Sequence, residues 1–158
     1  MTSVYILMER FCEPKEGMKR ITCYLILICS FLCCQSAAAE ALAVVAHPSV
    51  KTEQLSVKEL KSIFSMRLTT WSEGALISVY VLPKQHKLHE SFCRNYLEIF
   101  SYQLERSWKR LVYSGFGQAP TQLATSLEIK ERVANTPGAI GYIREEDVDD
   151  SVKTIRID

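Results

Sequence analysis

The sequence predicts an α/β domain in which helices flank a mostly parallel or mixed sheet. Beyond residue 41, short apolar runs typical of buried strands alternate with longer segments whose apolar residues recur at helical spacing. The same region contains no internal repeat and no low-complexity tract. Across all 158 residues, 47% are hydrophobic and 23% are charged, which is close to the average of soluble globular proteins. This composition argues against wholesale disorder and against a polytopic membrane protein.

The charge balance argues against a nucleic-acid partner. The chain carries 19 Lys and Arg residues against 18 Asp and Glu residues, a formal net charge of +1. Proteins that bind phosphate backbones normally carry a clear basic excess or a basic stripe. We therefore expect no binding to nucleic acid.

Residues 1–39 have the pattern of an export signal. A basic start at residues 18–20 precedes fourteen mostly apolar residues, 21–34. The small residues Ala37 and Ala39 then occupy the two positions that a signal peptidase reads. We therefore predict that residues 1–39 are a cleaved signal peptide.

Cleavage after Ala39 is expected to leave a mature domain of residues 40–158 in the periplasm, and the alternative cleavage after Ala41 would leave residues 42–158. The true start is either residue 1 or Met18. Five of the six cysteines precede residue 35, so only Cys93 remains and no intramolecular disulfide is expected. The alternative is an uncleaved anchor, although the apolar run is shorter than the roughly 20 residues that span a membrane.

The first half of the predicted domain contains two strands and a helix. Residues 41–46 form a continuous apolar run, which suits a strand buried on both faces. A capping box of Ser56 and Glu59 then starts a helix. Residues 71–74 are typical of a turn, and residues 77–82 of a second buried strand that the following proline ends. The apolar face of the helix comprises Val57, Leu60, Ile63 and Phe64.

Three further helices are predicted in the second half. The second of the three begins after a cap at Ser101, and a Gly-containing loop at residues 113–120 follows it. A capping box of Thr125 and Glu128 opens the last helix, which runs to about residue 135. The apolar face of the first of these helices comprises Leu88, Phe92, Tyr96 and Ile99. The apolar face of the second comprises Leu104, Trp108, Leu111 and Val112.

Two strands are predicted to complete the domain. The Thr-Pro-Gly sequence at residues 136–138 ends the last helix, because the residue before a proline is pushed out of helical conformations. Residues 139–143 then form a short buried strand. Residues 152–157 form a last strand whose side chains alternate between its two sides.

Polar residues and glycines occur in three loops that follow predicted strands or helices. Ligands of open α/β sheets gather at the carboxyl ends of the strands, where the free N–H groups of helix N-termini favour anions. We therefore expect a small anion to bind where the three loops meet. The alternative is that these residues only shape turns. The predicted ligand-binding residues are His47, Ser49, Lys84, His86, Ser114, Gly115 and Gly117.

The predicted mature chain shows no catalytic motif. H-E-x-x-H, G-x-S-x-G, C-x-x-C and phosphate-loop patterns are absent from it, so we expect no enzymatic activity and no cofactor. His86 and His89 lie three residues apart and offer two metal ligands, but the sequence places no third, so no metal site is predicted. Cys93 is expected to be a small buried hydrophobe rather than a nucleophile.

The order of several segments is distinctive when they are taken together. An opening strand is followed by HPS at 47–49, LSVKELKSIF at 55–64, an Arg-to-Trp segment at 67–71, SGFG at 114–117 and TPGAIGY at 136–142. This order resembles the small periplasmic phosphate-binding-protein-like family, the substrate-binding component of phosphate ABC importers. The resemblance spans about residues 42–143 and implies a shortened type II periplasmic-binding-protein fold.

The resemblance also implies a function. Full-length members have two lobes that close on phosphate, which they hold with an Arg and a Ser-Gly-Thr-like run after the strand that matches residues 77–82. In this chain residues 83–89 are PKQHKLH, without either feature. Despite this difference, the resemblance implies a periplasmic solute-binding protein for a small phosphate-like anion, serving the membrane component of an ABC importer. The alternative is a degenerate binding-protein fold that acts as a periplasmic interaction or regulatory module.

Overall fold

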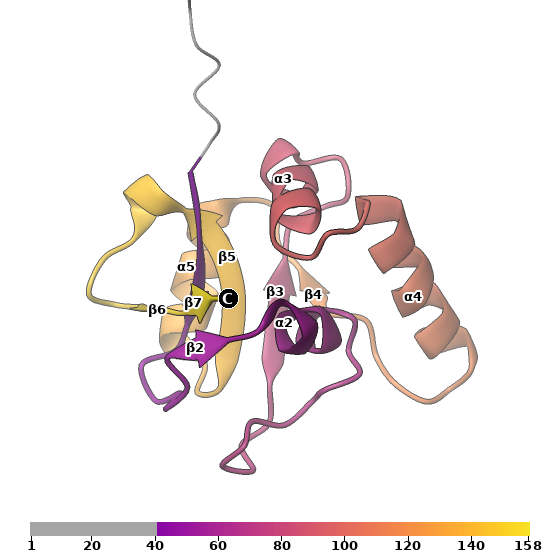
Figure 1. Ribbon diagram of the computed structural model, residues 1–158, viewed down its shortest axis with the longest axis horizontal. Helices are drawn as coiled ribbons and strands as arrows, with labels where there is room; N and C mark the ends of the chain where they lie inside the picture. Colours follow the sequence, from indigo (N-terminus) through magenta and orange to yellow (C-terminus); the bar gives the residue numbers. More distant parts are fainter. Residues whose placement is uncertain (1–40) are drawn as a thin grey trace, which may run out of the picture. The chain divides into compact units, whose positions relative to one another are not determined.

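The computed structural model describes residues 41–158, and the predicted signal peptide, residues 1–39, lies outside the described residues. Strands and helices alternate along the described chain, as the sequence predicts (Figure 1). The elements are β1 (Leu42–Ala46), β2 (Gln54–Leu55), α2 (Val57–Phe64), β3 (Ser78–Val81), α3 (Lys87–Asn95), α4 (Ser101–Tyr113), β4 (Thr121–Gln122), α5 (Ser126–Asn135), β5 (Ala139–Arg144), the 3-10 helix η1 (Glu145–Asp147), β6 (Lys153–Thr154) and β7 (Arg156–Ile157).

The main sheet has the strand order β4-β3-β5-β1-β6. β3 pairs in parallel with both β4 and β5, whereas β1 pairs antiparallel with both β5 and β6. The predicted mixed sheet flanked by helices is therefore confirmed. Ala46 at the end of β1 and Val79 near the start of β3 are both paired with Ile140 of β5. β1 consequently ends at the edge of the sheet where β3 begins.

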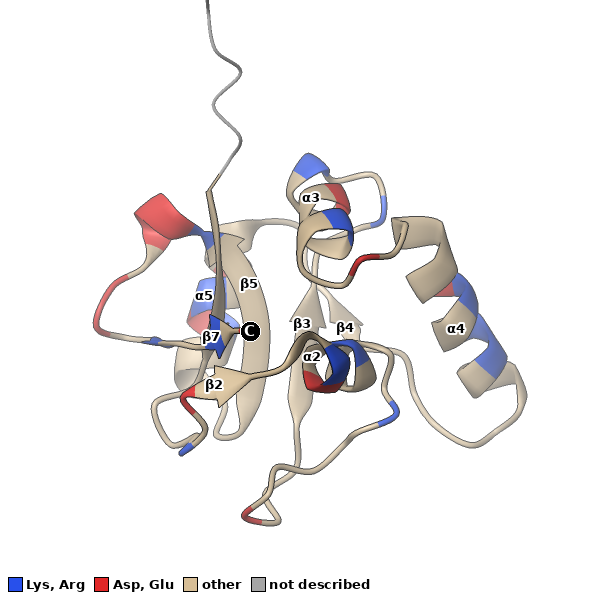
Figure 2. Cartoon of the chain, viewed as in Figure 1, with Lys and Arg blue, Asp and Glu red and all other residues tan. Residues whose placement is uncertain are grey.

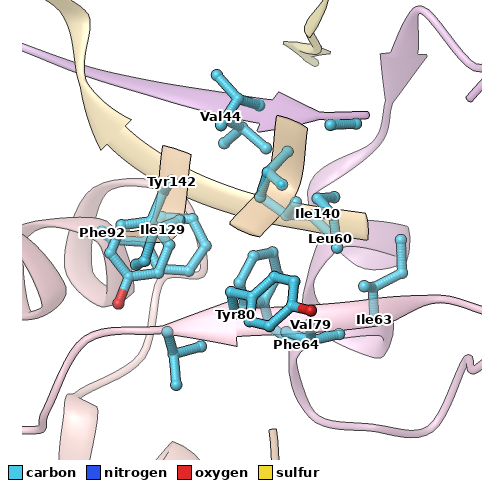
Figure 3. Close-up of a cluster of buried hydrophobic side chains, with 14 of the residues drawn as sticks. Val44, Leu60, Ile63, Phe64, Val79, Tyr80, Phe92, Ile129, Ile140 and Tyr142 are labelled. Carbon is cyan, nitrogen blue, oxygen red and sulfur yellow. The ribbon is translucent and has the colours of Figure 1, made fainter. Parts of the chain in front are cut away.

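Helices cover both faces of the central strand β5. Gly141 faces α5, since a Cβ atom at this position would lie 2.5 Å from a methyl carbon of Ile129. The next residue, Tyr142, points to the opposite face because side chains alternate along a strand. Its ring stacks on Phe92 of α3 with the centroids 4.1 Å apart, and Phe64 of α2 lies beside them (Figure 3). The core therefore lies on both sides of β5.

Local capping chemistry begins two of the helices. Ser56 and Glu59 form the predicted capping box of α2: the Ser56 N–H donates to the Glu59 carboxylate at 2.9 Å, and the Glu59 N–H donates to the Ser56 hydroxyl at 3.3 Å. At α5 the Thr125 hydroxyl accepts the Glu128 N–H at 3.2 Å, as predicted. The Glu128 carboxylate instead accepts the N–H of Ala124 at 2.8 Å, so this box is one residue wider than predicted.

Two predicted helix boundaries are wrong. The cap of α4 is Phe100 rather than Ser101, because the Gln103 side chain accepts the Phe100 N–H at 3.0 Å. α3 ends at Asn95, so Ile99 lies beyond it, and Glu98 adopts a positive φ of 52° that breaks the helical path. In α4 the predicted apolar face is too wide, since Val112 is 47% exposed.

The predicted last strand at residues 152–157 is also wrong, because it is split between two sheets. β6 pairs with β1 in the main sheet, whereas β7 pairs in parallel with β2 in a separate two-stranded sheet. Between them the buried Ile155 donates its N–H to the carbonyl oxygen of Val44 at 2.9 Å. The two-residue strands β2 and β4 were not predicted, and β3 is one residue shorter at each end than the predicted strand.

Gly138, in the turn before β5, is expected to tolerate no side chain. Its φ is +76°, and a Cβ atom would lie 2.3 Å from the carbonyl oxygen of Leu76. Gly115 is a matched control, since its φ is +72° but a Cβ atom there would have no other atom within 4 Å. Gly115→Ala should therefore cost only the left-handed strain of about 1–2 kcal/mol. Gly138→Ala should cost about 1 kcal/mol more because the backbone must also move.

Urea unfolding of the two variants measures the difference. Equal losses of unfolding free energy in Gly138→Ala and Gly115→Ala would contradict the close approach of Leu76 to the turn.

Candidate functional site

The three loops predicted to meet around an anion do not meet. The His47 N–H donates to the carbonyl oxygen of Ala139 at 3.0 Å, which places His47 beside the first residue of β5. Lys84 follows the carboxyl end of β3. Because β3 is parallel to β5, this end lies at the opposite edge of the sheet from the first residue of β5, and so from His47. The prediction that these loops share one edge is wrong because β1 runs antiparallel to β5. The length of a four-residue strand, about 13 Å, separates the two edges.

The loop that carries His47 and Ser49 is a compact turn. The Ser49 N–H donates to Nδ1 of His47 at 3.0 Å, and the Ser49 hydroxyl lies 2.7 Å from the same nitrogen. The Val50 N–H donates to the His47 carbonyl oxygen at 2.9 Å. These bonds engage the donors of Ser49 within the turn, which favours the turn-shaping interpretation of this pair.

The loop that carries Ser114, Gly115 and Gly117 follows the C-terminal end of α4. All three residues are exposed, and the Ser114 hydroxyl donates to the Leu111 carbonyl oxygen at 2.9 Å. A helix C-terminus presents carbonyl oxygens and the negative end of the helix dipole. This loop therefore offers an anion less favourable electrostatics than a helix N-terminus does.

The segment between β3 and α3 combines a strand end, a helix N-terminus and basic side chains. His86 is the N-cap of α3, and its Nδ1 accepts the Leu88 N–H at 3.2 Å. Lys84 lies 3.1 Å from a carboxylate oxygen of Glu105 on α4, and Lys87 is the exposed first residue of α3. Of the predicted site residues, Lys84 and His86 are thus the pair that lies next to a helix N-terminus.

A buried polar chain lies beneath this segment. The Leu82 N–H donates to the Tyr142 hydroxyl at 2.9 Å, and that hydroxyl lies 2.5 Å from Nδ1 of His89. Nε2 of His89 lies 3.5 Å from the sulfur of Cys93. Every group is satisfied when Tyr142 donates to Nδ1 and His89 carries its own proton on Nε2. His89 is therefore turned into the core rather than toward a metal shared with His86.

The surroundings of the buried polar chain keep its side chains uncharged. Burial, with a smaller contribution from the charge of His86, lowers the pKa of His89 to about 4. Burial raises the pKa of the Cys93 thiol to about 12 and also raises the pKa of Tyr142. A thiol in this state is a poor nucleophile. The prediction that Cys93 is a buried hydrophobe is confirmed, since its side chain is fully buried.

Sequence reasoning missed the buried polar chain. His89 and Tyr142 lie 53 residues apart, and no local pattern links them. Tyr142 belongs to the TPGAIGY segment, which the prediction used for a turn, a strand and the family resemblance but not for a buried hydrogen bond.

Two adjoining hollows of about 550 and 430 Å³ lie along α2 and share Glu59 and Leu68 as lining residues. Arg67 lines the first hollow and Trp71 the second. The N-terminus of α2 already holds the Glu59 carboxylate, whose pKa the hydrogen bonds from Ser56 lower. The N–H and hydroxyl of Ser56 are therefore already engaged by Glu59 and are not free to bind an anion that enters the first hollow, although Lys58 and Arg67 line it.

Residues 41–158 contain no group of three His, Cys, Asp or Glu side chains placed to hold a metal. In the same residues, none of the helices has both the length and the apolar character needed to cross a membrane.

No family model and no curated protein matches the chain, but solved structures do. A Clostridium perfringens protein, described as a phosphate ABC transporter substrate-binding protein and solved with bound phosphate, is 22% identical with a TM-score of 0.61; the match covers 74% of this chain and 44% of that one. An ABC-type phosphate transport receptor from Vibrio cholerae is 19% identical with a TM-score of 0.58, covering 74% and 46%. PstS from Borrelia burgdorferi is 15% identical with a TM-score of 0.54, covering 75% and 47%.

These likenesses confirm the predicted fold. The described chain has a truncated form of the fold of phosphate ABC transporter substrate-binding proteins, and it spans less than half the length of those it matches. The proteins it resembles are binding proteins rather than enzymes.

Proposed function

We propose that this chain, with the fold of phosphate ABC transporter substrate-binding proteins, binds a small phosphate-like anion without catalysing a reaction. The site is the N-terminus of α3, next to Lys84, His86 and Lys87. The observation that supports this site most strongly is that one short segment contains the carboxyl end of β3, the N-terminus of α3 and two lysines, Lys84 and Lys87. His47, Ser49 and the glycine loop are not part of this proposed site.

The resemblance supports the same position. In full-length phosphate binders the residues that hold the anion follow the strand that matches residues 77–82, and in this chain α3 begins shortly after that strand. The Clostridium perfringens protein was solved with phosphate bound. Lys84 and Lys87 supply the positive charge that an Arg supplies in those proteins.

The expected affinity is modest. His86 already bonds the Leu88 N–H, which leaves the N–H groups of Lys87 and His89 as the first-turn donors. Lys84 must also exchange its ion pair with Glu105 for one with the anion. Because a hydrogen bond to a charged group contributes about 1.5–3 kcal/mol, Lys84→Ala should weaken phosphate binding at least about tenfold.

Calorimetric titration of phosphate and sulfate tests this site. Lys109→Ala is the matched control, since Lys109 pairs at 3.2 Å with the other carboxylate oxygen of Glu105, and it should leave the phosphate affinity within about twofold. Ser49→Ala should bind as the wild type does, because Ser49 lies at the opposite edge of the sheet. Weaker binding in Ser49→Ala with unchanged binding in Lys84→Ala would move the site to that edge.

The same proposal includes export and transport. Residues 1–39 would serve as a signal peptide that delivers residues 40–158 to the periplasm, where the domain would present the anion to the membrane component of an ABC importer.

The alternative is a periplasmic interaction or regulatory module that binds no solute. Five of the eight large hydrophobic residues that are exposed in residues 41–158 lie in the segment from Phe100 to Phe116. This concentration favours a surface that contacts another macromolecule. Absence of heat from every anion in the titration would support this alternative.

A further inference from the structure

The end of α4 and the loop after it form an exposed apolar tip. We use "α4 tip" for Val112, Tyr113 and Phe116, which are 47%, 88% and 88% exposed. Gly115 and Gly117 flank Phe116, so neither neighbour carries a side chain that shields the ring. Figure 1 shows α4 and this loop at one edge of the domain. The tip is therefore a projection with aromatic side chains directed to solvent.

Basic residues lie directly next to this tip. We use "α4 stripe" for Arg106, Lys109 and Arg110, which are all exposed. Arg106 and Lys109 lie seven and four residues before Tyr113 and share its face of the helix. The opposite face carries Leu104 and Trp108, which are buried. The stripe and the tip thus form one continuous surface on the outer side of α4.

Basic residues outnumber acidic ones on α4, and acidic residues cluster at η1. Figure 2 shows basic residues along α4 and acidic residues around η1 on the other side of the sheet. The acidic residues of η1 are Glu145, Glu146 and Asp147. Near an anionic surface the basic residues of α4 are attracted, whereas η1, whose Glu146 lies 4.0 Å from Arg144, offers no comparable basic surface.

Exposed aromatic rings beside basic side chains match the chemistry of an anionic lipid surface. Aromatic and apolar side chains enter the headgroup region, and each Lys or Arg near an anionic leaflet strengthens binding about fivefold. A projecting tip with two aromatic rings suits insertion between headgroups.

We propose that the α4 tip and the α4 stripe dock this domain onto an anionic lipid surface. Tyr113 and Phe116 enter the headgroup region, and Arg106, Lys109 and Arg110 face the lipid phosphates. This docking surface differs from the proposed anion site, because the α4 tip lies at the C-terminal end of α4 and the anion site lies at the N-terminus of α3; the two adjoin at Glu105, which pairs with both Lys84 and Lys109.

Sedimentation with lipid vesicles tests the docking. The protein should bind vesicles that contain about one third phosphatidylglycerol in phosphatidylcholine, and it should not bind phosphatidylcholine alone. The double variant Tyr113→Ser/Phe116→Ser and the triple variant Arg106→Gln/Lys109→Gln/Arg110→Gln should each weaken binding at least about tenfold, and raised salt should weaken it as well. These side chains are exposed, so the variants should fold, which circular dichroism verifies.

Leu76→Ser is the matched control, since Leu76 is 73% exposed but precedes β3, away from α4. It should bind vesicles as the wild type does. The proposal is overturned if phosphatidylglycerol vesicles are not bound or if either multiple variant binds them as the wild type does. It is also overturned if Leu76→Ser loses as much vesicle binding as the multiple variants do. Equally tight binding to soluble polyaspartate that survives loss of the α4 tip would replace the lipid with an acidic protein partner.

Discussion

Trp108→Ala should lower the free energy of unfolding by about 3–5 kcal/mol, the range for a large buried aromatic residue. Trp108 is 3% exposed on the inner face of α4, and its indole N–H donates to the carbonyl oxygen of Phe64 at 2.7 Å. That bond joins α4 to the last residue of α2. The substitution therefore opens a cavity and also leaves a buried carbonyl oxygen without its donor.

Urea unfolding measures this loss. Tyr102→Ala is the control on the same helix, because Tyr102 is 56% exposed, and it should change the free energy by less than about 1 kcal/mol. Phe64→Ala should fall in the same range of about 3–5 kcal/mol as Trp108→Ala, since the Phe64 ring is fully buried with its centroid 4.6 Å from that of Phe92. A loss below about 1 kcal/mol for Trp108→Ala would mean that α4 does not pack as described.

Acidification should destabilise the domain through His89. In the folded state its pKa is lowered to about 4, whereas the unfolded chain takes up the proton near the ordinary value of 6.5. Between these values the unfolded state binds more protons, so stability falls as the pH falls from about 6.5 to about 4. The full difference corresponds to about 3 kcal/mol. Above pH 6.5 and below pH 4 this contribution no longer changes.

Unfolding free energies at pH 7 and pH 4.5 isolate this effect. His89→Gln removes the titrating ring and should lose less stability on acidification than the wild type does. His47→Gln makes the same substitution outside the core and shows what the loss of a histidine does by itself. Carboxylates whose pKa is lowered, such as Glu105 beside Lys84 and Lys109, contribute equally to all three proteins. An unchanged pH dependence in His89→Gln would refute the assignment.

The elements that the sequence predicts well are those whose causes are local. β1 and β5 are continuous apolar runs, and such runs suit strands buried on both faces. The capping box of α2 depends on two side chains three residues apart. The two-residue strands β2 and β4 were missed because distant partners define them: Gln54 becomes a strand residue only because it pairs with Arg156.

The candidate site depended on information that no local pattern contains. The loops after β1 and β3 share an edge only if those strands run in the same direction, and that direction is set by pairing with β5. A strand has the same composition and the same hydrophobic periodicity whichever way it runs in the sheet, so neither property reveals its direction. Lys84 and His86 were placed correctly at a helix N-terminus because the apolar spacing that starts α3 follows them directly in the sequence.

The pairing of β1 has a consequence for the order of folding. Leu42 pairs with Arg144 and Val45 with Thr154, so each of these contacts closes a loop of more than a hundred residues. Contacts between residues far apart in sequence slow folding, because the entropy of loop closure is lost before the contacts form. α2 and α5, with capping side chains close in sequence, have the means to form early. The apolar strand β1 is therefore synthesised long before its hydrogen-bonding partners on both sides, β5 and β6.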